Sequence, residues 1–426
     1  MTGRTISQYP WSGTSPSCSP GRWGAPAQTE LQVTPGGRRL PGVPWMIFMG
    51  PNRLCPSPLP RLLLLLLSLT LALSAADKRA KNVILFIGDA GGIPALHAAS
   101  IHGFNEPNKL FIQNMPGLGL MDTSAAGAWV TDSAAAMTAI VTGQKTDNGV
   151  VSESVADPGT KERTVLKTIL EYAEERGLST GVISNSPVAD ATPAACYAHV
   201  DARAKTGEIF AQVLKPRFGD GVDLIIGPGR KAIFEATAKL GLDLEPGLRE
   251  RGYGVYNAAD AIPADARRAV ALFDSSEYDL GAAVEAAIGI LSRNRKGFFL
   301  MVESDVHTNN LRRGLDRILV LDGIIRRTAA RMKKDTLIVF AADHSFDIRV
   351  RGGRRTGSLL PAPAAGPAAK PPANPNVRVE DGHTGEQVLV SAQGPGSQRV
   401  RGFFANTDLF GIMMSAYGWK AASPAR

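Results

Sequence analysis

An aspartate and a serine stand side by side in the stretch WVTDSAAAMTA, residues 129–139, where an extended run gives way to small, helix-favouring residues. A serine hydroxyl is a weak nucleophile at neutral pH and needs a general base, a depressed pKa or a metal ion to lose its proton. No histidine stands near Ser133 in the sequence. We therefore expect metal activation of Ser133, at a helix start whose N–H groups and dipole favour a bound phosphate.

Carboxylates and histidines follow several apolar runs of the chain. They are Asp89 after LFIG, Glu303, Asp305 and His307 in LMVESDVH, Asp343 and His344 in VFAADH, and His383 in VEDGHTGEQ. One aspartate at a strand end is usually a cap or turn residue, but several together favour a metal centre. Mixed Asp and His ligands suit zinc and an all-oxygen set suits magnesium. A simple N-cap role for Asp132 or Ser133 would explain the helix start but not these residues.

The apolar runs themselves predict the fold. NVILFIGD, STGVISNS, VDLIIGPG, GFFLMVES and TLIVFAADH look like strands buried on both faces, and helical patterns lie between them at TVLKTILEYAEERG, LGAAVEAAIGILSRN and RRGLDRILVLDGIIRRTAARM. This alternation predicts an α/β fold, a doubly wound, mostly parallel central sheet with helices on both faces. Ligands of such a fold collect at the carboxyl ends of the strands, where the polar residues stand.

The N-terminal region has a different character. Residues 1–48 are rich in Gly, Pro, Ser and Arg without periodicity, so we expect an over-extended start, with Met46 or Met49 as the true initiator, or disorder. Residues 49–76 have the layout of a signal peptide with cleavage after Ala76, and the apolar run is too short for a comfortable membrane span. The mature chain is then secreted or periplasmic, without a membrane span, and residues 77–426 form a single catalytic domain.

Composition bears on the kinds of partner, on disulfide bonds and on one loop. The formal charge is +8 and the pI about 9.4, but Lys and Arg are scattered with few aromatic neighbours, so we expect no nucleic-acid partner. Cys196 is the one cysteine left after cleavage, which excludes an intramolecular disulfide and favours a buried, structural role. The Pro- and Ala-rich segment 359–376 is predicted to be an exposed loop without capacity to form a core element.

Six blocks, in this order, resemble the alkaline phosphatase family in its secreted bacterial form. The blocks are KNVILFIGD, VTDSAAAMTAIVTGQKTDNGVV, DATPAACYAHVDAR, FFLMVES, VFAADH and GHTGEQVLVSAQGP. The resemblance implies hydrolysis of small phosphate monoesters through a phosphoseryl intermediate on Ser133, and it suggests a homodimer. Arg203 matches the arginine that clamps the phosphate, and Asp132 is expected to orient it.

The resemblance also implies two zinc ions and one magnesium ion. Asp89, Asp343 and His344 match the ligands of the zinc that activates the serine. Asp89, Thr192 and Glu303 match the magnesium ligands, and Asp190 matches a residue that orients a water beside that ion. His383 matches a ligand of the other zinc, which activates the hydrolytic water and stabilises the leaving alkoxide.

This sequence departs from the family at the remaining ligands of the second zinc. The family places an aspartate five residues and a histidine nine residues after the magnesium-binding glutamate, where this chain has Thr308 and Arg312. A guanidinium cannot bind a cation. Residues 303, 305 and 307 of an extended strand share one face, so we assign Asp305 and His307 to this zinc, with Asn309 or Asn310 as alternatives.

The remaining histidines and two alternative functions complete the predictions from the sequence. His97, His102 and His199 are expected to be structural, and His199 is expected to lie in a helix. A phosphodiesterase of the same superfamily is one alternative function, and a non-catalytic phosphate-binding relative with an altered zinc site is another. The motif of a sulfatase is absent around Ser133.

Overall fold

The computed structural model describes residues 79–332, 334–362 and 374–420. The predicted signal peptide at 49–76 and the segment 1–48 lie outside the described residues. Among the helices of the described ranges, none combines the length and the apolar character that crossing a bilayer requires.

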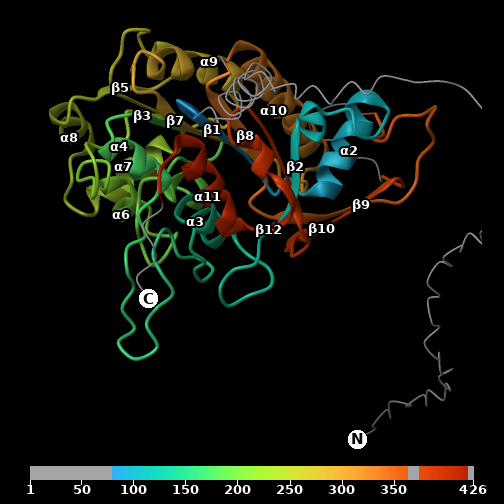
Figure 1. The fold of residues 1–426 in the computed structure, drawn as a ribbon, viewed down its shortest axis with the longest axis horizontal. Helices are drawn as coiled ribbons and strands as arrows, with labels where there is room; N and C mark the ends of the chain where they lie inside the picture. The colour runs from blue at the N-terminus through green and yellow to red at the C-terminus, as the bar shows by residue number, and fades with distance from the viewer. Residues whose placement is uncertain (1–78, 333, 363–373, 421–426) are drawn as a thin grey trace, which may run out of the picture. The chain divides into compact units, whose positions relative to one another are not determined.

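A ten-stranded sheet runs through the described part of the chain (Figure 1), in the order β12-β2-β11-β8-β1-β7-β3-β4-β6-β5. All neighbouring strands pair in parallel except β11, which is antiparallel to β2 and β8. The sheet strands are β1 (Asn82–Asp89), β2 (Gly117–Asp122), β3 (Ser179–Ser184), β4 (Leu224–Pro228), β5 (Gly254–Tyr256), β6 (Ala269–Phe273), β7 (Phe298–Asp305), β8 (Thr336–Ala341), β11 (Val388–Gln393) and β12 (Arg401–Ala405). The predicted mostly parallel sheet is confirmed. A separate antiparallel ribbon joins β9 (Ser345–Val350) and β10 (Val377–Thr384).

Helices cover both faces of the sheet, as the sequence predicts. One face carries α3 (Ser133–Thr142), α4 (Ile169–Glu175), α5 (Ala191–Ala194), α6 (Thr206–Ala211), α7 (Arg230–Ala238), α8 (Leu244–Glu250) and α11 (Asn406–Tyr417). The other face carries α2 (Ile93–Phe104), α9 (Leu280–Leu291) and α10 (Leu311–Arg331). In Figure 1 the α9 and α10 helices lie above the sheet and α3 and α11 below it.

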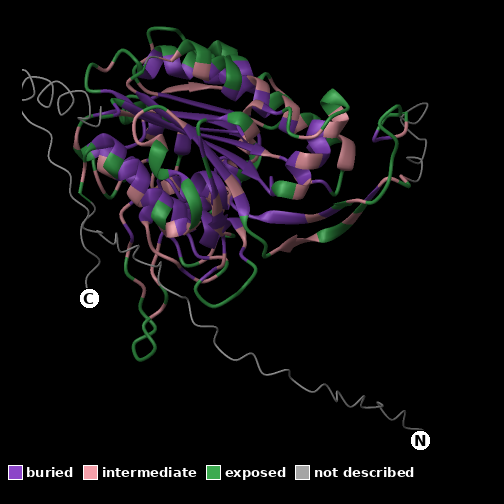
Figure 2. Cartoon of the chain, turned by 45° about the vertical axis from the view of Figure 1, so that its right-hand side comes forward, coloured by how far each residue is buried: buried purple, intermediate pink, exposed green. Residues whose placement is uncertain are grey.

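The central strands are buried on both sides, which explains their unbroken apolar sequence. Along β1, Val83 and Leu85 point into one core, while Ile84 and Phe86 point into the other. Figure 2 shows the central strands of the sheet as buried. A parallel sheet covered on both faces has few positions that face water, so its strands read as nearly continuous apolar runs without alternation.

Helix α4 begins later than the apolar periodicity suggests. Thr168 and Glu171 form a capping box at its start, so the helix begins at Ile169 and not with the preceding TVLK. His199, expected in a helix, instead lies in a segment after α5 where Val200 bridges to Val151. Its buried ring bonds the Ser152 carbonyl and Glu171, so its structural role is a tertiary one.

The segment 359–376 is not uniformly exposed. Leu359 and Leu360 are both 4% exposed and belong to the core on the α9 and α10 face. The expectation that this segment contributes nothing to a core is therefore wrong at its first two residues, because burial of two adjacent leucine side chains is favourable. Residues 363–373 lie outside the described ranges.

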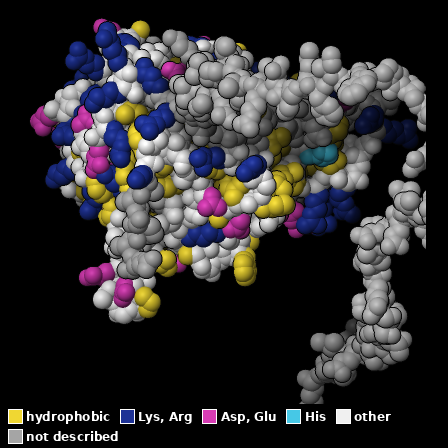
Figure 3. Space-filling model, in the orientation of Figure 1, with side chains coloured by type: hydrophobic (Ala, Val, Ile, Leu, Met, Phe, Trp, Pro, Cys, Tyr) yellow, Lys and Arg dark blue, Asp and Glu magenta, His cyan; other side chains and the backbone are white. Residues whose placement is uncertain are grey.

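The surface charges are mixed. On the face shown in Figure 3, Lys and Arg side chains are interspersed with Asp and Glu side chains. This agrees with the scattered pattern of the sequence, and the absence of a nucleic-acid partner stays a prediction.

A buried carboxyl far from the predicted site gives a testable pH dependence. Burial of Glu174 on α4 raises its pKa from 4.5 to about 8, although Thr180 and the Gly221 N–H donate to it. The folded state therefore holds a proton that the unfolded chain releases near pH 4.5, and stability falls as the pH rises from about 4.5 to about 8.

We expect Glu174→Gln to raise the free energy of unfolding at pH 8, on the order of a few kcal/mol, and to change it little at pH 5. The amide keeps the shape and neutral state of the protonated carboxyl. Thermal unfolding at both pH values measures the difference, with the exposed Glu250→Gln as control. Equal effects of Glu174→Gln at the two pH values would contradict this account.

Candidate active site

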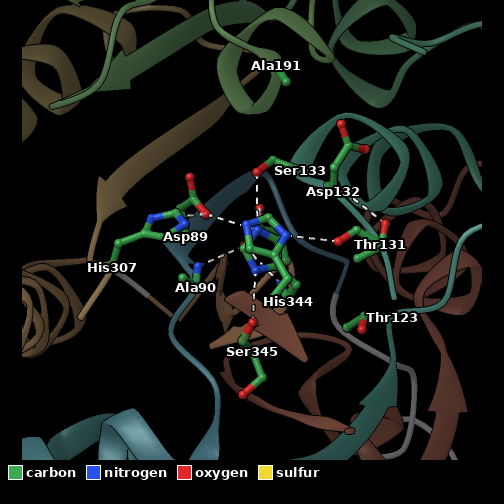
Figure 4. Close-up of polar contacts among 12 residues, drawn as sticks. Asp89, Ala90, Thr123, Thr131, Asp132, Ser133, Ala191, His307, His344 and Ser345 are labelled. Carbon is green, nitrogen blue, oxygen red and sulfur yellow. Dashed lines mark hydrogen bonds and ion pairs between the residues drawn. The ribbon is translucent and has the colours of Figure 1, made fainter. Parts of the chain in front are cut away.

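The predicted site residues converge at the carboxyl ends of the central strands. Strand β1 lies between β7 and β8, so Asp89 at the end of β1 is the register partner of Asp305 at the end of β7. The segment that follows β8 carries Asp343 and His344 to the same edge. Figure 4 shows Asp89, His307, His344 and Ser133 facing one another. Parallel strands bring their ends to one edge, which explains why four separate segments meet.

Ser133 lies at the first position of α3 and is 3% exposed. Asp132 caps the helix by accepting a hydrogen bond from the Ala135 N–H at 3.1 Å. The Ser133 hydroxyl lies 3.2 Å from His344 Nε2, as the dashed line in Figure 4 marks. Tertiary structure thus supplies the histidine that Ser133 lacks in its own sequence neighbourhood. His344 Nε2 also lies near the carboxylates of Asp89 and Asp343, so this histidine is a candidate metal ligand.

Asp89, Asp343 and His344 form the first cluster that could hold a metal ion. One ligand atom of each lies within 4.8 Å of the others. The His344 Nδ1–H donates to the Ser345 carbonyl at 3.1 Å, which leaves the Nε2 lone pair free, and Nε2 lies 3.2 Å from Asp89 Oδ1. Asp89 Oδ1 and Asp343 Oδ2 are buried without a hydrogen-bond partner. Buried lone-pair atoms that face one another fit a shared divalent cation.

The pKa values of this cluster show the same need for positive charge. Burial raises the pKa of Asp89, but the close approach of His344, whose Nε2 lies 3.2 Å from Asp89 Oδ1, outweighs it and lowers that pKa to about 2. Burial and the charge of Asp89 raise the pKa of Asp343 to about 6. Burial lowers the pKa of His344, but Asp343 and Asp89 outweigh it and raise that pKa to about 9. The charges of Asp89 and Asp343 therefore favour positive charge at this place, which a bound cation would supply.

Three histidines form a second cluster. His307, His344 and His383 each offer a nitrogen, and the three nitrogens lie within 4.8 Å of one another. The His344 and His383 rings stack with centroids 3.7 Å apart. The His383 Nδ1–H donates to the Thr131 carbonyl at 3.0 Å, two residues before the nucleophile. Burial and the nearby charge of His344 lower the pKa of His383, which favours the neutral ring that binds metals.

The segment after β7 differs from the expected extended strand. The strand ends at Asp305, so His307 lies beyond it and still reaches the site. Asp305 belongs to neither cluster: Oδ1 accepts from His307 Nδ1 at 2.8 Å and Oδ2 from Arg317 at 3.1 Å. Asn309 and Asn310 are exposed, and Asn310 caps α10, so neither is drawn into the site.

Thr308 and Arg312, at the family's usual ligand positions, take no part in the two clusters. Thr308 is buried and its hydroxyl has no hydrogen-bond partner among the described residues. Arg312 donates to the Pro361 carbonyl. The interpretation that Arg312 is not a ligand agrees with this geometry.

Glu303, the predicted magnesium ligand on β7, is 1% exposed and accepts a hydrogen bond from Ser184. Burial, followed by the charge of Asp89, raises its pKa well above 4.5. Thr192 lies buried on α5. Ser184 ends β3, beside β7, and the sequence analysis missed it although its place at a strand end gave the same signal as the others.

Arg203 is held by two carboxylates. Its Nη1 donates to Asp132 Oδ2 at 3.1 Å and its Nη2 to Asp190 Oδ1 at 2.8 Å. Burial disfavours the charged guanidinium, but Asp190 and Asp132 outweigh it and raise its pKa. The predicted contact of Asp132 with Arg203 is present. The ion pair of Asp190 with Arg203 was not predicted, since Asp190 was matched only to the magnesium.

The turn after β1 is tight and places residues 90–92 close to the segment that follows β8. Ala90 has φ of 67°, in the left-handed region where an alanine costs roughly 1–2 kcal/mol over glycine. A Cβ on Gly92 would lie 2.0 Å from Ser345 Oγ, so this position excludes a side chain. The small residues after Asp89 allow the close approach of Ser345, and the left-handed φ of Ala90 adds strain.

Comparison with known proteins gives one family. The family model described as alkaline phosphatase matches residues 80–261 and 265–374. The chain is 29% identical over 427 residues to the alkaline phosphatase of Escherichia coli, covering 82% of this chain and 88% of that protein. It is 28% identical over 415 residues to the mouse tissue-nonspecific isozyme of alkaline phosphatase, covering 82% of this chain and 76% of that protein.

Solved structures agree with the fold. A magnesium-bound variant of the alkaline phosphatase of the Antarctic bacterium TAB5 is similar with a TM-score of 0.66 and 25% identity, covering 80% of this chain and 99% of that one. The Thermus thermophilus alkaline phosphatase has a TM-score of 0.67 at 22% identity, covering 80% and 92%. This second likeness concerns the fold alone.

Proposed function

The chain belongs to the alkaline phosphatase family and is a phosphatase, and we propose that it hydrolyses phosphate monoesters with the help of metal ions and through a phosphoseryl intermediate on Ser133. The observation that carries the proposal is the position of the Ser133 hydroxyl, 3.2 Å from the His344 Nε2 that also faces the unpaired oxygen of Asp89. A nucleophile set directly against a metal-ligand cluster needs no separate base.

The proposed ions are two zinc ions and one magnesium ion. Asp89, Asp343 and His344 would hold one zinc ion, and His307 and His383, with Asp305 beside them, would serve the other. Asp89, Glu303 and Thr192 would hold the magnesium ion. When bound, these ions lower the pKa of the Ser133 hydroxyl and stabilise the charge on the leaving oxygen. The buried, unpaired oxygens of Asp89 and Asp343 support this assignment.

The chain's own residues bind and orient the phosphate. Arg203 presents a planar guanidinium that Asp132 and Asp190 fix from two sides, and its side chain is 31% exposed, so a substrate can reach it. The N-terminus of α3 directs its dipole toward the same anion. Together these groups favour a terminal phosphate with two negative charges.

The reaction then follows in two displacements at phosphorus. Ser133 Oγ gives up its proton and attacks phosphorus, the bond to the alcohol oxygen breaks, and the leaving oxygen takes up a proton as the alcohol departs. Water next attacks the phosphoseryl group, and the Ser133 oxygen leaves as it regains its proton. Arg203 contacts the phosphate in both steps. Ser133 Oγ attacks in the first step and leaves in the second, while the phosphoryl oxygens stay beside the guanidinium.

Arg203 also separates this proposal from a phosphodiesterase. The wild-type protein is expected to prefer p-nitrophenyl phosphate to bis-p-nitrophenyl phosphate. Arg203→Ala is expected to lower kcat/KM for the monoester by roughly 10²- to 10³-fold and for the diester much less, because a diester has only one charge to pair. Steady-state kinetics with both substrates measure this.

Arg203→Lys is the matched control, since it keeps the charge and loses the planar fork, so its monoester activity should lie between wild type and Arg203→Ala. Diester preference in the wild type would favour the diesterase alternative. Absence of turnover with either substrate in the zinc- and magnesium-loaded protein would favour a non-catalytic phosphate-binding relative.

Two expectations from the sequence belong to the same proposal. Export to the periplasm or medium follows from the signal-peptide layout at 49–76, and N-terminal sequencing of the exported protein tests cleavage after Ala76. A homodimer follows from the resemblance, and light scattering of the purified protein tests it.

A further inference from the structure

Asp305 has donors on both carboxylate oxygens. Oδ1 accepts from the His307 Nδ1–H at 2.8 Å and from the His307 backbone N–H at 3.1 Å. Oδ2 accepts from Arg317 Nη1 at 3.1 Å, and the Asp305 backbone N–H donates to Asn185 at 2.7 Å. The carboxylate is therefore fixed at both ends, with His307 on one side and Arg317 on the other.

We propose that Asp305 positions His307 and does not itself bind an ion, and that Arg317 holds Asp305 in that role. This inference rests on the metal-dependent function proposed above. It assigns the second metal site of this chain to imidazole nitrogens, with a carboxylate and an arginine behind one of them. Asp305 and Arg317 are positioning residues, because both act through His307.

All three histidines of the second cluster have the same arrangement. The Nδ1–H of His344 donates to the Ser345 carbonyl and that of His383 to the Thr131 carbonyl. His307 uses the Asp305 carboxylate in the corresponding place. A metal-binding histidine usually donates its second N–H to an oxygen in this way, which fixes the tautomer and directs the other nitrogen to the ion. With Nδ1 as the donor, Nε2 is the nitrogen that keeps its lone pair in each ring, and in His344 it lies 3.2 Å from Ser133 Oγ.

Arg317 explains why Asp305 supports the ring instead of binding the ion. Its side chain is 12% exposed and contacts Asp305 through Nη1 and Glu277 through Nη2, so it is fixed by two acids. Its positive charge offsets that of the carboxylate and competes with a cation for Oδ2. Asp89 Oδ1, which has no hydrogen-bond partner, lies 3.8 Å from His307 Nδ1.

The test compares Asp305→Asn, Arg317→Gln and the control Arg313→Gln. Arg313 lies on the same helix and contacts Ser276 and Glu277, as Arg317 does, but not Asp305. Each protein is equilibrated in buffers that hold the concentration of free zinc constant. Elemental mass spectrometry then measures the number of zinc ions bound per chain. Cobalt replaces zinc in a parallel series, and its visible spectrum reports the ligand set.

If Asp305 positions His307, Asp305→Asn keeps the full number of zinc ions and the cobalt spectrum, because the amide oxygen still accepts the Nδ1–H. Its weaker hydrogen bond lowers the affinity of one ion by about 10- to 100-fold. Arg317→Gln lowers the same affinity by a smaller factor, Arg317→Lys restores part of it, and Arg313→Gln leaves it unchanged.

Loss of one zinc ion in Asp305→Asn, or a cobalt spectrum with a ligand removed, would overturn the inference. So would unchanged or tighter binding in Arg317→Gln, since release of Oδ2 should help a true ligand. Thermal unfolding of the metal-free proteins identifies a variant that does not fold, and Arg317→Lys then carries the test. A wild-type protein that binds no zinc would instead contradict the proposed function.

Discussion

Ser133→Ala is expected to lower kcat for p-nitrophenyl phosphate by roughly three to six orders of magnitude, the range in which loss of a catalytic nucleophile falls. The variant lacks the hydroxyl oxygen that accepts the phosphoryl group in the proposed reaction, which lies 3.2 Å from His344 Nε2. Zinc content should stay at the wild-type value, because the cluster of Asp89, Asp343 and His344 does not include the serine. Stopped-flow and steady-state assays measure kcat, and metal analysis measures the zinc.

Trapping the intermediate gives an independent readout. Wild-type protein quenched in acid during turnover of labelled substrate should carry phosphate on Ser133, and Ser133→Ala should carry none. Ser154→Ala, a serine in the segment between Ser152 and Thr164 outside the site, should behave as wild type. A variant Ser133→Ala that keeps a tenth of the wild-type activity would show that another group is the nucleophile.

Removal of the metal ions is expected to have the second large effect. Activity should fall by about a thousandfold or more in excess chelator, since the ions contribute several kcal/mol to the transition state and each 1.36 kcal/mol is a factor of ten. Zinc with magnesium should restore it. Turnover that is insensitive to chelator would contradict the metal assignment.

The folded state should also lose stability with the ions. Asp89, Asp343 and Glu303 are buried together, and bound cations relieve their mutual repulsion. Free ion at one hundred times its Kd stabilises the fold by about 2.7 kcal/mol. The same fall in melting temperature in chelator should appear in Ser133→Ala, because ion binding does not need the nucleophile. A fall confined to the wild type would tie the ions to the serine.

The sequence predicted the central sheet well because its signal is local. Five of the parallel strands read as unbroken apolar runs, and the ends of β1, β7 and β8 carry acids and histidines at the positions where the structure has them. The starts of helices were harder to predict. At α4 the capping box of Thr168 and Glu171, and not the apolar period, decides where the helix begins.

The contacts behind the site residues could not be predicted from the sequence. Asp190 and Arg203 are thirteen positions apart in the chain, and their ion pair depends on how the segment after α5 folds. Arg317 contacts Asp305 because α10 folds back over the end of β7. Ser184 meets Glu303 through strand pairing between segments far apart in the chain. No local period records such pairings, since each depends on register and helix placement.

What the sequence determined by itself is the set of chemical groups and the edge of the sheet that presents them. The central strands are mostly apolar because both faces are buried, so most of their charged side chains stand at the strand ends. What only the tertiary structure decided is which groups face one another. It sets His344 against Ser133, gives Asp305 to His307 and Arg317, and leaves Asp89 and Asp343 with unpaired oxygens. Those choices follow from packing over long distances in the chain, where a shift of one residue in register would turn each side chain to the opposite face.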